Sequence, residues 1–280
     1  MQGKVVVITG ATSGIGKVAA EKLAAMGARM LVIARSRTRG EATLKRLSAT
    51  APEIDHRVYY ADLSIVKEMK RVGDEIAAAE SRIDVLINNA GALFGKREMT
   101  GEGLERTFAT NHMSYFVVTE QLRQRLLASA PARVINTSSE AHRGMKIDFG
   151  DLQGARRYQP FRAYGRSKLC NILFTRELAR QLSGTGVTVN CLHPGFVNTR
   201  FGDESKGPLS LLFRIAKKFA ISPENGADTI VFLASSKEVS GTTGEYFYQC
   251  RPKTSSIEAQ DYEAAKRLWE ESAKLGNDSV

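Results

Sequence analysis

The sequence has little cysteine and no long hydrophobic run. Its three cysteines, Cys170, Cys191 and Cys250, lie far apart without Cys-x-x-Cys spacing, which indicates neither a disulfide framework nor a zinc site. This usage favours a reducing compartment, and we expect a cytoplasmic protein. No stretch approaches the roughly 18 apolar residues that cross a membrane, and a β-branched run begins at Val5, too early for a signal peptide. The sequence therefore predicts neither export nor a transmembrane segment.

The charge is not concentrated in blocks of one sign. Forty Lys and Arg residues against 30 Asp and Glu give a net charge of +10, which permits attraction to the phosphates of a nucleotide, a nucleic acid or a membrane. The basic residues are dispersed among acidic ones and form no recognised nucleic-acid-binding motif, so we expect no nucleic-acid partner. Hydrophobic residues at 42% and charged residues at 25% exclude disordered and collagen-like chains.

Short apolar, β-branched runs alternate with longer stretches that have apolar residues at three- and four-residue spacing. The runs cover residues 5–9, 30–34, 58–60, 85–88, 134–137 and 187–192, and the periodic stretches include residues 18–26, 104–127 and 169–182. This alternation predicts an α/β fold of the Rossmann type, a doubly wound parallel sheet flanked by helices, because each parallel pair needs a crossover. No linker interrupts residues 1–280, so we expect a single domain with an insertion at 200–221 and a closing helix at 258–275.

A glycine-rich segment follows the first predicted strand and leads into the first predicted helix. It contains Gly10, Thr12, Ser13, Gly14, Ile15 and Gly16, with Gly-x-x-x-Gly-x-Gly spacing. Backbone N–H groups in this context can bind a pyrophosphate, although the same glycines could form a purely structural turn. The next residue, Lys17, opposes the helix dipole, which is easier to explain if a phosphate lies nearby. The segment therefore favours a dinucleotide cofactor.

The end of the second predicted strand indicates which dinucleotide is preferred. An acidic residue about 20 positions after the glycines would bind the ribose 2′-hydroxyl of NAD. The sequence instead has Arg35, followed by Arg37 and Arg39. A guanidinium can pair with a 2′-phosphate in a forked geometry, which favours NADP(H) over NAD(H) and points first to Arg35. For Arg37, Arg39 and Lys17, a solvated surface position explains the residue equally well.

Several motifs, in one order, resemble those of the single-domain type of the short-chain dehydrogenase/reductase family. They are the segment 9–16, Asp62-Leu63, Asn88-Asn89-Ala90-Gly91, Asn111, Ser139, Tyr164-x-x-x-Lys168 and Pro194-Gly195. The resemblance covers nearly the whole chain. Stretches at 111–112, 138–142, 171–174 and 193–195 are similar to the retinol-dehydrogenase-like branch. Many members of that branch carry an amino-terminal membrane anchor, whereas this chain begins at its first strand, so we do not expect membrane residence.

The resemblance implies a catalytic set of Asn111, Ser139, Tyr164 and Lys168. Tyr164 and Lys168 lie four residues apart in a helical stretch and share one face, where the ammonium can lower the phenol pKa toward neutrality. Tyr164 would then be the general acid and base, and Lys168 would also hold the nicotinamide ribose. Ser139 would hydrogen-bond the reacting oxygen, with Ser138 as the alternative. Asn111 would kink its helix and hold a water that links Lys168 to solvent.

The remaining cofactor contacts follow from the same resemblance. Beside Tyr164 and Lys168, they comprise Asp62, Leu63, Asn89, Ala90, Gly91, Pro194, Gly195, Val197 and Thr199, and Asn88 would border the adenosine ribose. Two positions have structural alternatives, because Asp62 could cap a helix and Gly91 could simply permit a tight turn. His142 and His193 have no partner at ligand spacing, so we expect structural or pocket-lining roles and no metal.

Residues 209–221 place apolar side chains at helical spacing, with Arg214, Lys217 and Lys218 between them. Such a segment could touch a membrane, but its position after the expected cofactor loop favours a lid over the substrate pocket. An apolar lid would exclude water from the reacting centre, which suggests a lipophilic carbonyl or alcohol as substrate. The helices at 104–127 and 169–182 are long enough for the family's usual dimer faces, which permits a homo-oligomer.

Together these features predict an NADP-dependent oxidoreductase that transfers a hydride between the nicotinamide and a carbonyl or alcohol. A nucleotide-binding sensor without turnover is the alternative from another class, because a fold alone does not establish activity. The complete Asn-Ser-Tyr-Lys set favours the enzyme. An epimerase or dehydratase of the extended branch would be expected to have a larger carboxy-terminal substrate domain.

Overall fold

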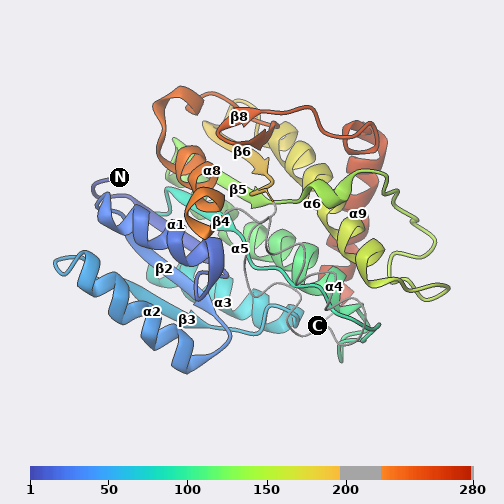
Figure 1. The fold of residues 1–280 in the computed structure, drawn as a ribbon, viewed down its shortest axis with the longest axis horizontal. Coiled ribbons are helices and arrows are strands. Elements are labelled where there is room, and N and C mark those ends of the chain that lie inside the picture. The colour runs from blue at the N-terminus through green and yellow to red at the C-terminus, as the bar shows by residue number, and fades with distance from the viewer. Residues whose placement is uncertain (196–221, 279–280) are drawn as a thin grey trace.

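The fold is built on a sheet whose strands come from the β-branched runs of the sequence. The computed structural model describes residues 1–195 and 222–278. Within these residues the sheet has eight strands, namely β1 (Val5–Thr9), β2 (Arg29–Ala34), β3 (Arg57–Tyr60), β4 (Val85–Asn88), β5 (Ala132–Thr137), β6 (Val187–Leu192), β7 (Tyr246–Tyr248) and β8 (Arg251–Pro252). Their order is β3-β2-β1-β4-β5-β6-β7-β8, and neighbours are parallel except for the antiparallel pair β7 and β8 (Figure 1).

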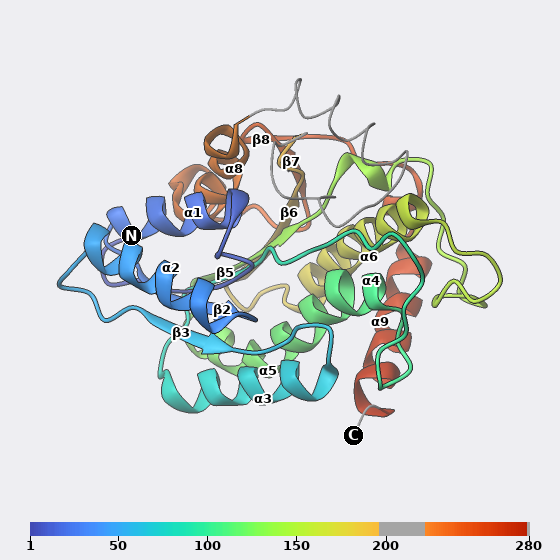
Figure 2. The ribbon, with the colours of Figure 1, turned by 60° about the horizontal axis from the view of Figure 1, so that its bottom comes forward.

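Helices cover both faces of this sheet (Figure 2). The described helices are α1 (Gly14–Ala25), α2 (Arg37–Thr50), α3 (Val66–Ala79), α4 (Arg106–Phe108), α5 (Ser114–Ala128), α6 (Pro160–Gln181), α8 (Pro223–Ser235) and α9 (Tyr262–Asp278). α1, α2 and α8 pack on one face, while α3, α5 and α6 pack on the other, with α9 lying against α6. One hydrophobic core therefore lies on each side of the sheet.

Strand β1 shows how the sequence builds both cores. Val6 and Ile8 are buried in the core on the α1 side, whereas Val7 is buried in the core on the α3 and α5 side. Successive strand residues point to opposite faces, so a strand that is covered on both faces is apolar throughout. The predicted doubly wound parallel sheet is confirmed, and the six predicted strands correspond to β1 through β6.

The carboxy-terminal part of the sheet is not indicated by the sequence pattern. β7 has three residues and β8 has two, which is too short for a periodic signal. Tyr246 and Phe247 of β7 are nevertheless almost fully buried and extend the parallel sheet beyond β6. In the stretch where a closing helix is expected, α9 begins at Tyr262 after a 3₁₀ turn at Glu258–Gln260. The predicted insertion at 200–221 lies outside the described residues.

Helix α9 packs against α5 and α6, the two helices whose length permits a homo-oligomer on the sequence evidence. The Trp269 ring of α9 lies 4.9 Å from the ring of Phe116 on α5 and 5.8 Å from the ring of Phe174 on α6. These aromatic contacts bury apolar surface of both helices within one chain. A homo-oligomer therefore stays a prediction, and its expected contact faces are at least partly covered by the chain's own last helix.

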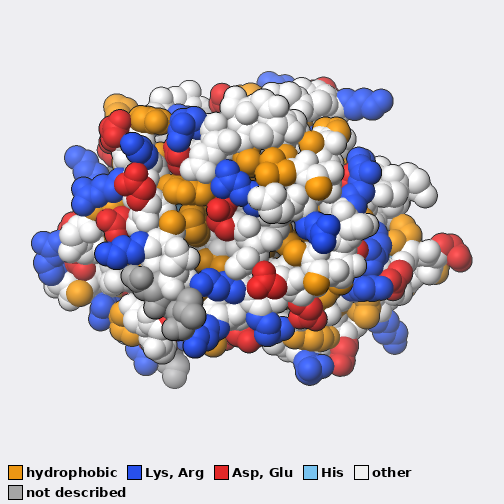
Figure 3. Space-filling model, turned by 180° about the vertical axis from the view of Figure 1, so that it is seen from behind, with side chains coloured by type: hydrophobic (Ala, Val, Ile, Leu, Met, Phe, Trp, Pro, Cys, Tyr) orange, Lys and Arg blue, Asp and Glu red, His pale blue; other side chains and the backbone are white. Residues whose placement is uncertain are grey.

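Charged side chains of both signs are spread over the surface. Figure 3 shows Lys and Arg interspersed with Asp and Glu on one face of the molecule. On α3, for example, Arg71 pairs with both Glu68 and Glu75. Among residues 1–195 and 222–278, no helix combines the length and the apolar character that crossing a membrane requires.

The parallel strands all end at the same edge of the sheet, where the loops that follow them meet. β1 and β4 are neighbours, but the chain continues from β1 toward β2 on one side and from β4 toward β5 on the other. Open α/β sheets bind ligands in the crevice that such a reversal leaves at the carboxyl ends of the strands. The order of the strands therefore places a candidate site beside the loops after β1, β4, β5 and β6.

Asp84 lies at the opposite edge of the sheet, where the strands begin, and binds the segments before β1 and β4. Its ionisation makes the free energy of unfolding depend on pH. Its carboxylate accepts hydrogen bonds from Arg82 Nη2 at 2.6 Å, Lys4 Nζ at 2.8 Å and the Val5 N–H at 2.9 Å. Burial alone would raise the carboxyl pKa, but these donors outweigh it and lower the pKa below its usual value. The stabilisation is therefore complete above the unfolded-state pKa of about 3.9 and is lost as the pH falls through the lower folded-state value.

We expect Asp84→Asn to lower the free energy of unfolding by about 2 kcal/mol at pH 7, because three donors lose a charged acceptor. At pH 3 the difference from the natural protein should shrink. Urea denaturation at both pH values measures this, with Asp74→Asn on the exposed side of α3 as the charge-matched control. A difference that persists in full at pH 3 would contradict the assignment.

Candidate active site

The loop after β1 packs directly against the loop after β4. Gly10 has a φ of +70°, and a Cβ at this position would lie 2.7 Å from the Ala90 Cα. A Cβ on Gly16, in the first turn of α1, would lie 2.4 Å from the Gly10 carbonyl oxygen and 2.4 Å from Asn89 Nδ2. Cβ atoms do not approach other atoms so closely, so both positions require glycine. The glycine pattern therefore serves a tight joint between β1, α1 and β4.

The beginning of α1 is suited to an anion. The N-cap residue Ser13 makes no side-chain capping hydrogen bond, and the first turn contains no acidic residue. Lys17 lies in the same turn, with its Nζ 4.0 Å from the Glu21 carboxylate. Helix N-terminal N–H groups and the helix dipole both favour negative charge. The other predicted residues of this turn are partly exposed, namely Thr12, Gly14 and Ile15.

Asn89 holds the loops after β1 and β4 together. Its side-chain amide donates to the carbonyl oxygens of Thr9 and Gly10, each at 3.2 Å. The Thr9 hydroxyl in turn accepts from the backbone N–H groups of Asn89 and Ala90, each at 2.9 Å. Asn88 lies deeper, where its amide donates to side chains of β5 and α5 rather than facing the edge. Asn89 thus shapes the joint between the loops, and Asn88 is a core residue.

The residues after β2 and β3 differ in their surroundings. Arg35 is exposed immediately after the last residue of β2, whereas the Arg37 guanidinium lies 4.9 Å from the ring centroid of Tyr60. Asp62 accepts hydrogen bonds from the backbone N–H and the hydroxyl of Ser64, at 3.0 and 2.8 Å. This contact is an Asx turn ahead of α3 rather than a helix cap, because the first N–H groups of α3, those of Val66 and Lys67, donate to the Glu102 carboxylate. The other predicted residue here, Leu63, is buried in the core.

Tyr164 and Lys168 share one face of α6 at the carboxyl edge of the sheet. The Lys168 Nζ lies 5.6 Å from the centroid of the Tyr164 ring and donates to the Thr137 carbonyl oxygen at 3.0 Å. The Ser139 hydroxyl forms a hydrogen bond with the Tyr164 phenol. Ser138 instead donates its hydroxyl to the buried Lys168 carbonyl oxygen at 2.8 Å. Of the two serines, therefore, it is Ser139 that the fold brings to the phenol.

Burial sets the protonation of this pair. It raises the pKa of Tyr164 to about 12, although the Ser139 hydrogen bond acts in the opposite direction. Burial also lowers the pKa of Lys168 to about 7. The lowered phenol pKa expected from the sequence is therefore not found in the protein alone. Tyr164 is protonated at neutral pH and can donate a proton, whereas the Lys168 ammonium is lost as the pH rises above about 7.

Asn111 lies in a π-helical turn, η1 (Ala109–Met113), between α4 and α5. Its Nδ2 donates to the Ala92 carbonyl oxygen at 2.9 Å, and its Oδ1 accepts from the Ala92 N–H at 2.8 Å. A Cβ on Gly91 would lie 3.2 Å from Lys168 Nζ and 3.4 Å from Asn111 Oδ1. A π-helical turn thus interrupts the helix at the residue where the sequence predicts a kink, and such turns are frequent at functional sites. The turn fixes the loop after β4 beside the lysine.

The loop after β6 is held by His193, for which the sequence predicts a structural or pocket-lining role, together with side chains that the sequence pattern does not single out. The Gly195 N–H donates to His193 Nδ1 at 3.1 Å, and the His193 ring stacks on Tyr248 with centroids 4.1 Å apart. Burial lowers the pKa of His193 to about 4, so the ring is neutral. Its Nε2 lies 3.1 Å from the Glu140 carboxylate, which Lys253 and Arg143 also contact. The described chain continues to Gly195, so Val197 and Thr199 lie outside it.

The second histidine of this edge is also engaged in structural contacts. His142 Nδ1 lies 2.7 Å from the Ser139 carbonyl oxygen, and His142 Nε2 accepts from the Ser256 N–H at 3.1 Å. The ring thereby connects the segment after β5 with the segment before α9. Within the described ranges, no three His, Cys, Asp or Glu side chains are grouped as a metal site would require.

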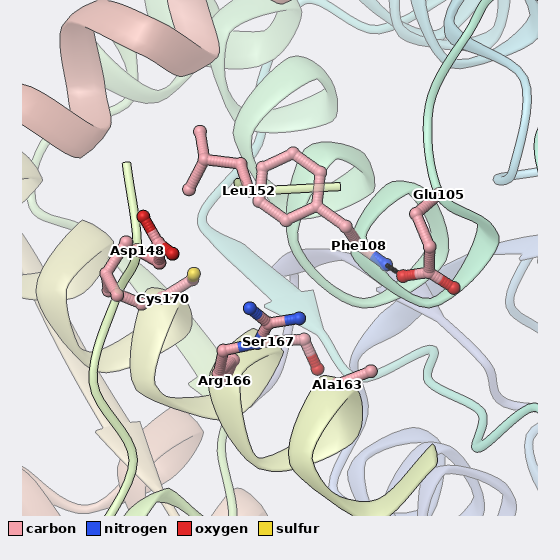
Figure 4. Close-up of a pocket in the computed structure, with 9 residues that line it drawn as sticks. Glu105, Phe108, Asp148, Leu152, Ala163, Arg166, Ser167 and Cys170 are labelled. Carbon is pink, nitrogen blue, oxygen red and sulfur yellow. Dashed lines mark hydrogen bonds between the residues drawn. The ribbon is translucent and has the colours of Figure 1, made fainter. Parts of the chain in front are cut away.

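A small cavity lies against another part of α6. Figure 4 shows it beside Phe108, Arg166, Ser167 and Cys170, and its volume is about 10 Å³. This is room for about one water molecule and far too little for an organic substrate. Tyr164 and Ser139 do not line it. The cavity is therefore not the substrate pocket.

The comparisons with known proteins agree with this arrangement. The sequence model of the short chain dehydrogenase family matches residues 4–208. Retinol dehydrogenase 12 of Mus musculus is 42% identical over 273 residues, which are 98% of this chain and 86% of that protein. The match includes the loops after β1, β4 and β5 as well as helix α6.

Solved structures share the fold. A crystal structure of an uncharacterised protein from Mycobacterium paratuberculosis superposes with a TM-score of 0.79 at 31% identity, and covers 99% of this chain and 94% of its own. A protein from Beutenbergia cavernae, described as an NAD(P)-dependent gluconate 5-dehydrogenase with bound NADP, superposes with a TM-score of 0.71 at 27% identity. That match covers 89% of this chain and 96% of its own.

Proposed function

This chain belongs to the short-chain dehydrogenase family of oxidoreductases, and we propose that it is an NADP-dependent member acting on a lipophilic carbonyl or alcohol. The observation that carries the proposal is the grouping at the carboxyl edge of the sheet. Tyr164 and Lys168 share one face of α6, and the Ser139 hydroxyl is hydrogen-bonded to the Tyr164 phenol. This grouping is what proton transfer to a carbonyl oxygen requires.

Each residue of the proposed site has a separate role in the reaction. A nicotinamide bound at this edge supplies or accepts the hydride. Tyr164 donates its phenolic proton to the carbonyl oxygen during reduction and takes a proton back during oxidation. Ser139 hydrogen-bonds the same oxygen as negative charge develops there. The Lys168 ammonium stabilises the phenolate that remains, and Asn111 keeps the Gly91 loop against the lysine.

The cofactor contacts are proposed from the same edge. The uncapped start of α1, with Gly14, Ile15 and Lys17, would take the pyrophosphate, and Arg35 would take the 2′-phosphate. Lys168 would hold the nicotinamide ribose. The remaining proposed contacts are Asp62, Leu63, Asn89, Ala90, Gly91, Pro194, Gly195, Val197 and Thr199. The bound NADP of the Beutenbergia cavernae protein supports the proposal that the cofactor is NADP(H).

The substrate class and the compartment are proposed from the names of the relatives and from the state of the cysteines. The names of the retinol dehydrogenase relatives support a lipophilic alcohol or aldehyde, and residues 200–221 would cover it. The three cysteines are free, which supports a reducing compartment such as the cytoplasm.

The first experiment separates binding from chemistry. Fluorescence titration with NADPH and NADH measures cofactor preference, and a panel of long apolar and small polar aldehydes and ketones then measures turnover. We expect tighter binding of NADPH and faster reduction of the apolar carbonyls. Binding of NADPH without turnover on any carbonyl would instead support a nucleotide sensor. Failure to bind either nucleotide would refute the proposal.

We expect Arg35→Ala to weaken NADPH binding by about tenfold to a hundredfold, because the 2′-phosphate loses a charge-assisted hydrogen bond. NADH lacks this phosphate, so its binding should stay within about twofold. Lys45→Ala, on the exposed face of α2, removes the same charge away from the site and serves as the control. Equal loss of both nucleotides in the Arg35 variant would argue against a role in cofactor choice.

A further inference from the structure

The Thr137 carbonyl oxygen, at the end of β5, accepts hydrogen bonds from three side chains. The Lys168 ammonium donates at 3.0 Å, and Asn171 Nδ2 and the Tyr115 hydroxyl each donate at 3.3 Å. This carbonyl oxygen accepts the hydrogen bond that holds Lys168, the lysine that the proposed reaction requires. Asn171 and Tyr115 are therefore connected to the active lysine through one shared acceptor.

Asn171 also reaches the π-helical turn. The same Nδ2 donates to the Asn111 carbonyl oxygen at 2.9 Å. Asn171 thus joins two main-chain carbonyls, one in η1 and one at the end of β5. Because Asn171 follows Lys168 by three residues and Tyr164 by seven, all three side chains lie along one face of α6.

The orientation of the Asn171 amide is determined by its neighbours. A flipped amide would direct Oδ1 at the Asn111 and Thr137 carbonyl oxygens, which are acceptors only. With Nδ2 donating to both, the buried Oδ1 has no hydrogen-bond partner among the described residues, and the same holds for the buried Nδ1 of His112. The Nε2 of His112 lies 2.9 Å from the Ser272 hydroxyl on α9. Asn171, His112 and Ser272 are completely buried.

A second buried amide close by, that of Asn136, donates to neither the Asn111 nor the Thr137 carbonyl oxygen. Asn136 on β5 donates to the Thr175 hydroxyl at 2.9 Å and accepts from Asn88 Nδ2 at 2.9 Å. It is as deeply buried as Asn171, and the Thr175 hydroxyl that it binds donates in turn to the Asn171 carbonyl oxygen at 2.7 Å. The two amides therefore share the cost of burying a polar group and differ in what they hold.

We propose that Asn171 is a positioning residue for the Tyr164 and Lys168 pair, an inference that rests on the proposed oxidoreductase function. By joining the Asn111 and Thr137 carbonyls, its amide fixes the π-helical turn relative to the end of β5. The distance between the Thr137 carbonyl oxygen, which binds the Lys168 ammonium, and the Tyr164 phenol is thereby fixed. Without the amide, the Asn111 carbonyl loses a buried donor and the turn relaxes away from β5, which moves the lysine relative to Tyr164.

The groups that face the lysine allow a pH readout. They are the Tyr164 phenol on α6 and the Tyr115 phenol on α5, and burial raises the pKa of each. The nearest further titratable ring in the network is His112 of η1, whose pKa burial lowers to about 4, so it is neutral. An alkaline loss of reduction rate near pH 7 therefore reports the ammonium of Lys168. A less firmly held ammonium has a lower pKa, so this limb should move to lower pH.

The test compares Asn171→Leu with Asn136→Leu, which remove equally buried amides of the same size. For each we would measure kcat and KM for NADPH and the carbonyl, the pH profile of kcat/KM, and the urea unfolding curve. Asn171→Leu is expected to lower kcat by about tenfold to a hundredfold, as a misplacement near 1 Å does, and to shift the alkaline limb downward by about half a unit. Asn136→Leu is expected to lose comparable stability with kcat within about twofold of the natural protein.

A second variant, Asn171→Ser, keeps the test valid if Asn171→Leu fails to fold, because serine is smaller than leucine. Its hydroxyl cannot bind both the Asn111 and the Thr137 carbonyl oxygens. It should show the same loss of kcat and the same shift. Unchanged kcat and pH profile in either Asn171 variant would overturn the proposal while leaving the oxidoreductase function intact. Equal losses of kcat in the Asn136 and Asn171 variants would overturn it as well, since burial alone would explain them. An inactive natural protein would refute the oxidoreductase function, and the positioning role with it.

Discussion

Replacing Tyr164 with Phe is expected to lower kcat by about 1000-fold while NADPH still binds. The substitution removes only the hydroxyl that donates the proton, and general acid catalysis contributes about 10² to 10⁴ in rate. The ring keeps its position on α6, and the Lys168 ammonium keeps its bond to the Thr137 carbonyl. Stopped-flow or steady-state measurement of NADPH consumption with an apolar aldehyde gives kcat, and fluorescence titration gives the dissociation constant of NADPH.

The matched control is Tyr262→Phe, which removes a hydroxyl from a half-exposed ring on α9. Its kcat should equal that of the natural protein within about twofold. A Tyr164→Phe protein that retains more than a tenth of the natural kcat would show that another group donates the proton. Loss of NADPH binding in the same variant would instead place the phenol in the cofactor site rather than in the proton transfer.

The sheet could be predicted because its strands are covered on both faces. Val6, Val7 and Ile8 are completely buried, and a run of apolar β-branched residues is the direct consequence of that environment. β7 could not be predicted in the same way, because three residues give no period and its burial depends on contacts with distant elements. Helix α9 was foreseeable as a helix, but its packing across α5 and α6 through Trp269 is a tertiary contact.

The candidate site was predictable where the chemistry depends on spacing along one element. Tyr164 and Lys168 are such a case, since four residues on a helix place two side chains on one face. The identity of the serine partner needed the structure, because Ser138 and Ser139 are neighbours that point to different partners. Asn171 carries no sequence signal of its own role: its two acceptors are main-chain carbonyls, and backbone atoms have no residue type to recognise.

The electrostatic expectation from sequence was incomplete for a physical reason. A lysine near a phenol lowers the phenol pKa if both remain hydrated enough for the ammonium to keep its charge. In the structure, burial disfavours both charged forms, so it raises the pKa of Tyr164 to about 12 and lowers the pKa of Lys168 to about 7. Depth of burial is a property of the packed fold and cannot be obtained from the spacing of the two residues.

Replacing Gly16 with Ala is expected to weaken NADPH binding by about 100-fold and to lower the free energy of unfolding by about 2 kcal/mol. Two effects oppose each other here. Alanine is the better helix former by about 1 kcal/mol. The added Cβ, however, would lie 2.4 Å from the Gly10 carbonyl oxygen, a backbone atom that cannot rotate away. The contact therefore prevails, and α1 must move away from the loop that presents its first N–H groups.

Gly95→Ala provides the control, because a Cβ at this exposed loop position has no atom within 4 Å. Its stability should stay within about 0.5 kcal/mol of the natural protein, and its NADPH binding should not change. Urea denaturation and fluorescence titration of both variants separate two readings of the glycine segment. If Gly16→Ala loses stability but binds NADPH normally, the glycines serve only the joint between strand and helix. If binding falls far more than stability, the closeness of α1 to β1 is itself what shapes the phosphate site, because a displaced helix start can no longer direct its N–H groups at one anion.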